Sequence, residues 1–118
     1  MSVFFVLKQF WEYPDGTTRE LMVEIKAGRK TNEWRDASPH WLSRLFTKKA
    51  MPSVRHRMLR HEGDLMFIHP DDYKYKKARF RVGYKMGPTL EADITRIWYH
   101  TDTDQFEFQF TNVVEVIA

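Results

Sequence analysis

Cysteine is absent from the sequence. A chain without cysteine forms no disulfide, no thiolate-ligated zinc site and no iron–sulfur cluster, and it has no thiol nucleophile. The chain also lacks an apolar run of the roughly 18 residues that a membrane-spanning helix needs, and its first residues show no basic segment like that of a secretion signal. We therefore expect a cytoplasmic protein with no membrane partner.

Glycine and proline are scarce, with five of each among 118 residues, and no low-complexity linker is present. Aromatic residues, by contrast, make up 15% of the chain. This content argues against disorder and predicts a core built on large rings. A chain of this length is expected to form one domain, so we predict a single domain over residues 1–118.

The net charge of +3 is small but unevenly distributed. Residues 29–85 contain 15 Lys and Arg against 6 Asp and Glu, a balance of +9, whereas the rest of the chain has 4 against 10, a balance of −6. Such asymmetry is typical of a protein that faces an anion such as a nucleic-acid backbone. The alternative is that these charges lie on ordinary solvated loops, because closeness in sequence is not closeness in space.

The five histidines show no metal-ligand spacing. His56 and His61 are five residues apart, whereas a helical zinc site needs two histidines four residues apart. The sequence also lacks the nucleophile elbow, the phosphate-binding loop and the dinucleotide-binding glycine motif. We expect no metal and no cofactor.

The first part of the chain predicts a strand followed by a short helix. Residues 3–11 have apolar side chains on both faces and end at turn residues 14–16. Residues 17–20 fit a capping box that begins a helix, and Gly28 stands where a left-handed residue ends it. A competing interpretation makes residues 21–25 the second strand of a hairpin.

The next part predicts a strand, a helix and a loop. A strand over residues 31–35 places Glu33 and Arg35 on one face and Trp34 on the other. A Ser-Pro pair at residues 38–39 begins a helix, and we expect Trp34 and the tryptophan of this helix, Trp41, to anchor the core. Residues 47–61 are basic and weakly patterned, so we expect a mobile basic loop, with one possible helical turn at Pro52-Ser53.

The second half predicts four strands, over residues 65–68, 78–84, 90–99 and 106–116, with turn residues between them, including 86–88. Clean alternation of apolar and polar residues gives each strand a buried face and a solvent-exposed face. We predict an antiparallel meander. Together with the first half it forms an α+β, mainly β fold, a small, partly open barrel of five to six strands with two or three short helices.

The segment AGRKTNEWR at residues 27–35 resembles the signature of the ASCH family, which belongs to the PUA-like superfamily. In a prokaryotic and phage-type branch of that family, the signature continues into a proline-led helix and a Gly-Asp-hydrophobic strand. The segments PHWLSRL at residues 39–45 and GDLMF at residues 63–67 are similar to both. The order of elements also matches over nearly the whole chain. A bare Gly-x-Lys-Thr is common, but its occurrence together with these later segments is not.

The resemblance implies a pseudo-β-barrel with a cleft beside the glycine turn that binds RNA or a modified nucleobase, nucleoside or nucleotide. By position, it implies that Lys30, Glu33 and Arg35 face the cleft. Some family members are amidohydrolases that act on acylated cytidine through a lysine, a threonine and a glutamate. Lys30 matches the lysine, but Glu33 stands at the threonine position and the long helical excursion before the last strands is missing.

The chemistry of these residues suits binding. Lys30 can hold a phosphate, and Glu33 can accept a hydrogen bond from an exocyclic amine or act as a general base. The planar guanidinium of Arg35 can donate paired hydrogen bonds to a phosphate or to a base edge. We expect Arg44 to join them. The alternative is structural: Lys30 interacts with the end of the preceding helix, and Glu33 and Arg35 form an ion pair.

Tyr73 and Tyr75 lie among lysines that include Lys76. Basic residues interleaved with aromatic ones suit stacking on bases and neutralisation of the backbone, although a solvated charged hairpin would look the same. Binding of RNA or a modified nucleotide is our leading hypothesis. Two alternatives stay open: a small amidohydrolase or ribonuclease that uses Lys30 and Glu33, and a module that binds an acidic protein partner.

Overall fold

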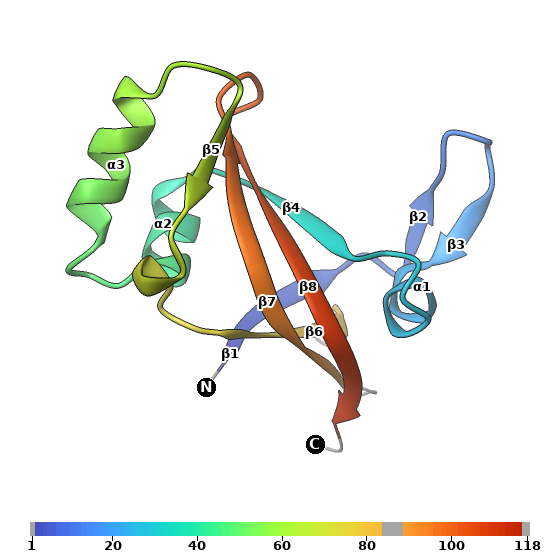
Figure 1. Cartoon of the computed structure of the whole chain (residues 1–118). Helices are drawn as coiled ribbons and strands as arrows, with labels where there is room; N and C mark the ends of the chain where they lie inside the picture. Colours follow the sequence, from blue (N-terminus) through green and yellow to red (C-terminus); the bar gives the residue numbers. More distant parts are fainter. Residues whose placement is uncertain (1, 84–88, 117–118) are drawn as a thin grey trace.

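The computed structural model describes residues 2–83 and 89–116. One sheet curls into a half-barrel (Figure 1), in the order β1-β6-β7-β8-β4 with β5 paired to β7. Its strands are β1 (Ser2–Leu7), β4 (Asn32–Asp36), β5 (Leu65–Ile68), β6 (Lys77–Val82), β7 (Thr89–His100) and β8 (Gln105–Val116). With three short α-helices beside the strands, this architecture confirms the predicted fold class.

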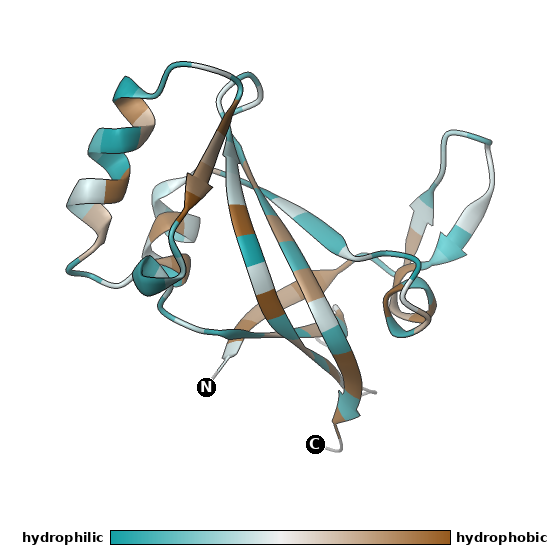
Figure 2. Ribbon diagram, viewed as in Figure 1, coloured by the Kyte–Doolittle hydropathy of each residue, from teal (hydrophilic) through white to brown (hydrophobic). Residues whose placement is uncertain are grey.

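Strands β7 and β8 form a long antiparallel hairpin that runs through the whole sheet. Figure 2 shows brown and teal residues alternating along both strands, because one face packs into the core and the other does not. Tyr99, Phe106 and Phe108 are buried on the inner face. The predicted turn over residues 86–88, and Tyr84 at the end of the strand predicted over residues 78–84, lie outside the described residues.

The predicted meander is wrong in one connection. Strand β5 pairs with residues 97–100 of β7, and β6 pairs with residues 90–93, so both lie along the same edge of β7. A short 3₁₀ helix, η1 (Pro70–Asp72), carries the chain between these two halves of the edge. Only β6, β7 and β8 form a meander, and β1 joins it by pairing in parallel with β6.

The core is one continuous apolar cluster inside the curled sheet. Phe5 lies fully buried in it and stacks on Trp41 and Phe80, with ring centroids 5.3 and 5.4 Å apart. Trp41 belongs to α2 (Pro39–Leu45), whose first turn is capped as predicted: the Ser38 hydroxyl accepts a hydrogen bond from the Trp41 amide. Trp41 therefore anchors the core, as expected.

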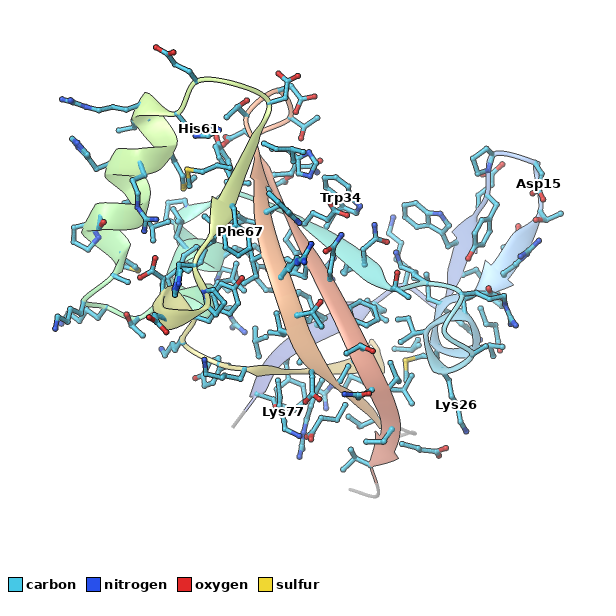
Figure 3. All side chains as sticks on the ribbon, in the orientation of Figure 1. Asp15, Lys26, Trp34, His61, Phe67 and Lys77 are labelled. Atoms are coloured by element: carbon cyan, nitrogen blue, oxygen red, sulfur yellow. The ribbon has the colours of Figure 1, made fainter. Side chains whose placement is uncertain are left out.

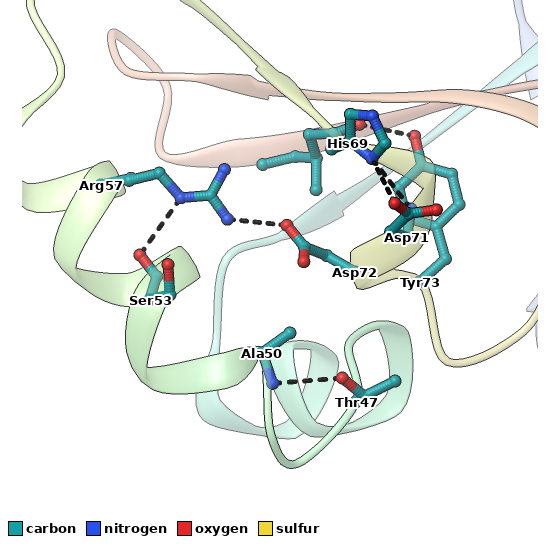
Figure 4. Close-up of polar contacts among 9 residues, drawn as sticks. Thr47, Ala50, Ser53, Arg57, His69, Asp71, Asp72 and Tyr73 are labelled. Carbon is teal, nitrogen blue, oxygen red and sulfur yellow. Dashed lines mark hydrogen bonds and ion pairs between the residues drawn. The ribbon is translucent and has the colours of Figure 1, made fainter.

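The expected basic loop over residues 47–61 is largely a helix, α3 (Met51–Arg60). Val54 is fully buried, and Met51 and Met58 pack against the core on the same side. Figure 4 shows how both ends of this segment are held: Thr47 accepts from the Ala50 amide, and Arg57 pairs with Asp72 of η1 at 2.7 Å. The three apolar residues follow helical spacing, but the cations between them hide the pattern.

The first half contains the predicted helix, and the competing strand over residues 21–25 is wrong, because these residues are helical. A hairpin does form, between β2 (Phe10–Glu12) and β3 (Thr18–Glu20), and a helix follows, α1 (Leu21–Lys26). The strand expected over residues 3–11 is therefore two strands. The capping box over residues 17–20 is wrong, because Asp15 accepts hydrogen bonds from both the amide and the hydroxyl of Thr17 within the turn, and α1 begins without a side-chain cap.

Candidate functional site

A cleft of about 730 Å³ lies where the half-barrel is open, between the end of β1 and strand β4. The β2–β3 hairpin and α1 stand beside it (Figure 1). Its lining includes three aromatic side chains and four cations: Trp11, Tyr13, Trp34, Lys8, Arg29, Lys30 and Arg35. The volume lies within the range of about 300–1,000 Å³ typical of pockets for small ligands.

An ion pair between Glu33 and Arg35 forms one wall of the cleft, with Nη1 of Arg35 3.1 Å from Oε1 of Glu33. The same carboxylate oxygen accepts from the Trp34 amide at 3.0 Å. Arg35 also donates to the Val6 carbonyl oxygen at 3.3 Å, so its side chain bridges the open seam between β4 and β1. The guanidinium lies 5.2 Å from the centroid of the Phe5 ring, which it faces. These contacts hold it in place.

Lys30 lies with its ammonium 5.6 Å from the centroid of the Trp11 ring. Trp11 is 48% exposed, so one aromatic surface at the cleft is open to a ligand. Lys8 and Lys30 have no carboxylate partner in the part of the chain that the structure describes. A cation beside a half-exposed ring, with a second cation lining the same cleft, can hold a phosphate group and a flat heterocycle together.

The glycine turn places Lys30 at the start of β4. Gly28 has a φ of +77°, which confirms the predicted left-handed end of α1. After it, the amides of Arg29 and Lys30 both donate to the Glu24 carbonyl oxygen, at 3.0 and 3.1 Å. These bonds end the helix and turn the chain towards β4, so residues 27–30 form a compact turn.

Arg29 lines the cleft and pairs with the buried carboxylate of Glu24. Its hydrogen bond lowers the pKa of Glu24 below the usual 4.5. A carboxyl group with a lowered folded pKa stabilises the fold above its unfolded pKa, and this stability is lost as pH falls through the folded value. We expect Glu24→Gln to lower the melting temperature at pH 7. Below about pH 4.5, the melting temperature of this variant is expected to fall less steeply with pH than that of the wild type.

Thermal melts from pH 7 to pH 3 test this prediction. The control is Glu12→Gln, because Glu12 is an exposed carboxylate on β2 without an ion pair in the described segments. The control is expected to keep the acid dependence of the wild type. If both variants lost the same share of the pH dependence of the melting temperature, the net charge of the protein, rather than the Arg29 contact, would determine it.

Three predicted site residues, Lys30, Glu33 and Arg35, line the cleft together. The structure does not bring the other four to it. Tyr73 is buried, 6% exposed, and its hydroxyl donates to the Ile68 carbonyl oxygen and accepts from the Ile97 amide. Burial in apolar surroundings raises the pKa of this hydroxyl. A ring held this way has no face for a base, so Tyr73 is a core residue rather than a stacking platform.

Arg44, Tyr75 and Lys76 lie on other surfaces. Arg44 is exposed on α2, and Lys76 is exposed just before β6. Tyr75 packs against the core, with the ammonium of Lys74 5.7 Å from its ring centroid. None of the three belongs to the lining of the cleft.

Sequence reasoning missed the contribution of the hairpin. Trp11 and Tyr13 line the cleft only because the β2–β3 hairpin turns back beside β4. The signal in the sequence was the aromatic pair Phe10 and Trp11 shortly before the predicted turn, and the structure leaves both rings about half exposed. Trp34 does not anchor the core as predicted: it lies on the outer side of β4, half-buried, with its ring centroid 4.4 Å from that of His100.

Comparison with models of protein families, with curated proteins and with solved structures finds no match. Within residues 2–83 and 89–116, no group of histidine and acidic side chains is arranged to hold a metal ion. No helix among these residues is long and apolar enough to cross a membrane.

Proposed function

We propose that this chain is an ASCH-type, PUA-like binding module that takes RNA or a modified nucleotide in the cleft between β1, β4 and the β2–β3 hairpin. The observation that carries the proposal is the set of groups at that cleft. Two cations without carboxylate partners in the described segments, Lys8 and Lys30, line the cleft, and Lys30 lies beside the half-exposed ring of Trp11. Stacking on the base and neutralisation of the phosphate are two of the main interactions by which proteins bind nucleotides.

Each group has a part in this proposal. Lys30 and Lys8 hold phosphate, and Trp11 stacks on the base. Glu33 presents its second carboxylate oxygen, Oε2, as an acceptor for an exocyclic amine, while Arg35 fixes the carboxylate from behind. Lys30 and Glu33 would also be the proton-handling pair of a hydrolase. Binding is favoured, because Oε1 of Glu33 already accepts from Arg35 and from a backbone amide.

Fluorescence anisotropy with short single-stranded RNA, duplex RNA and DNA probes tests the proposal at low and moderate salt. We expect Lys30→Ala to weaken binding about tenfold and to make the salt slope shallower by about 0.7, the change for one lost phosphate contact on a single strand. The matched control is Lys26→Ala, because Lys26 is an exposed lysine of α1 paired with Glu115.

Lys26→Ala is expected to bind like the wild type. Equal losses in the two lysine variants would mean that binding follows net charge and not the cleft. No binding of the wild type to any probe, or to free modified nucleosides, would overturn the proposal. Turnover of RNA or an acylated nucleoside that disappears in Glu33→Gln would replace it with the hydrolase.

A further inference from the structure

A row of aromatic side chains crosses the outer face of the sheet. The strand register places Phe67 of β5 opposite Trp98 of β7, Trp98 opposite Glu107 of β8, and Glu107 opposite Trp34 of β4. These residues point outwards, because side chains alternate along a strand and the buried residues of each strand, including Met66, Tyr99, Phe108 and Glu33, stand next to them. Adjacent strands lie about 4.8 Å apart, so the row spans roughly 14 Å.

One ring of this row, that of Phe67, is exposed, and those of Trp98 and Trp34 are partly exposed. Phe67 is 44% exposed, and its ring meets Trp98 edge to face with centroids 5.3 Å apart. Leu65, in the next position on the same face of β5, is 49% exposed. Figure 3 labels Phe67 at β5 and Trp34 on the far side of the β7–β8 hairpin. Contiguous exposed apolar side chains are uncommon on monomeric proteins, and where they occur they often mark a binding surface.

Polar groups fix the geometry of the row. Glu107 accepts a hydrogen bond from Asn32 at 3.0 Å, and its other oxygen lies 2.9 Å from Nε2 of His100. The His100 ring is tilted by 50° against the ring of Trp34, with which it is in contact. The neighbouring row contains Arg96 opposite Gln109. Arg96 is exposed and has no ion-pair partner in the described part of the chain. The face therefore carries a cation and amide groups beside its rings.

The aromatic row and the cleft meet at β4. Asn32, Trp34 and Gln105 belong to the outer face by register, and all three also line the cleft. Glu33 and Arg35 line the cleft from the inner side of the same strand. A ligand that occupies the cleft can thus continue around the edge of β4 onto the aromatic row without leaving the protein surface.

We propose that the ligand is a single strand of RNA, with one nucleotide in the cleft and the following bases stacked on Trp34, Trp98 and Phe67. The inference rests on the proposed function and names its partner. A free nucleotide is too short to reach the row, and a duplex keeps its bases stacked within the helix, with no free faces for the protein rings. Stacking on successive rings tolerates any base, so the row adds affinity with little sequence preference.

Competition against a labelled eight-nucleotide single-stranded RNA tests the inference. The competitors are the unlabelled strand, its two- and four-nucleotide fragments, a nucleoside monophosphate and the corresponding duplex. We expect affinity to rise steeply with length, and we expect the monophosphate and the duplex to compete at least tenfold more weakly than the full strand. Phe67→Ala and Trp98→Leu are each expected to weaken binding about tenfold.

The salt dependence separates the row from the cleft. Removal of a stacking ring is expected to leave the salt slope unchanged, whereas Lys30→Ala makes it shallower. The matched control is Phe4→Ala, because Phe4 is an equally exposed phenylalanine, at 41%, on β1. It is expected to bind like the wild type, and melting curves of every variant correct the affinities for the folded fraction.

Wild-type affinity in both Phe67→Ala and Trp98→Leu, or competition by the monophosphate as strong as by the full strand, would overturn the inference. The proposed function would then still stand if Lys30→Ala is weakened. Absence of binding to every probe in the wild type would overturn both.

Discussion

Replacement of Phe5 with alanine is expected to lower the free energy of unfolding by about 4 kcal/mol, because the ring is fully buried where three elements of the core meet. It stacks on Trp41 of α2 and Phe80 of β6, and its centroid lies 5.0 Å from that of Phe108 of β8. Truncation removes the burial of the ring and leaves a cavity that its neighbours fill only in part. Since domains are stable by about 5–15 kcal/mol, this is a large share.

Urea denaturation measures this change, and Phe4→Ala is its control. Phe4 is the preceding residue of the same strand and points to the other face, where it is 41% exposed. Its loss is expected to cost less than about 1 kcal/mol. The slope of the unfolding free energy against urea concentration is expected to stay the same in both variants. Equal losses for Phe4 and Phe5 would contradict the central position of the Phe5 ring in the core.

Replacement of Arg35 with methionine is expected to cost about 2–3 kcal/mol. Methionine keeps the apolar stem but removes the charge partner of Glu33, which is only 8% exposed. An uncompensated carboxylate in such a place is costly, and we expect less than the roughly 3–5 kcal/mol typical of a fully buried pair because 21% of the Arg35 side chain is exposed. The hydrogen bond to Val6 across the seam is lost as well.

The double variant Arg35→Met, Glu33→Gln separates the charge effect from the seam contact. With no carboxylate to compensate, the double variant is expected to recover part of the stability that the single Arg35 variant loses. Denaturation of the two single variants and the double variant completes the cycle. Strictly additive losses would show that the two side chains act independently. Because Arg35 supports the fold, Lys30 is the better residue with which to test binding.

The parts of the fold that depend on local pattern were predictable. Alternation predicts the long strands of the sheet, and the Ser-Pro pair predicts the start of α2. The helix α3 was not predictable in this way, because its stability depends on contacts with distant residues. Val54 enters a core made mostly of other elements, and Arg57 pairs with Asp72, fifteen positions later in the chain.

The same distinction applies to the site. Lys30, Glu33 and Arg35 share one short segment, so the alternation of a single strand is enough to bring them together. Trp11 reaches the cleft only through the position of a hairpin relative to β4, which depends on long-range contacts. Tyr73 stands in a segment as basic and aromatic as a binding loop, and only its two backbone hydrogen bonds reveal that it is internal.

The parallel pairing of β1 with β6 has a consequence for the synthesis of the chain. Ser2 lies opposite Lys77, so about 75 further residues must be synthesised after β1 before its partner strand can pair with it. At about 5–20 residues per second, the wait is several seconds. During this time Phe5, which later lies at the centre of the core, has none of its partners from β6 or β8. The nascent chain therefore exposes an apolar, aggregation-prone segment to chaperones until its partner residues of β6 and β8 have been made.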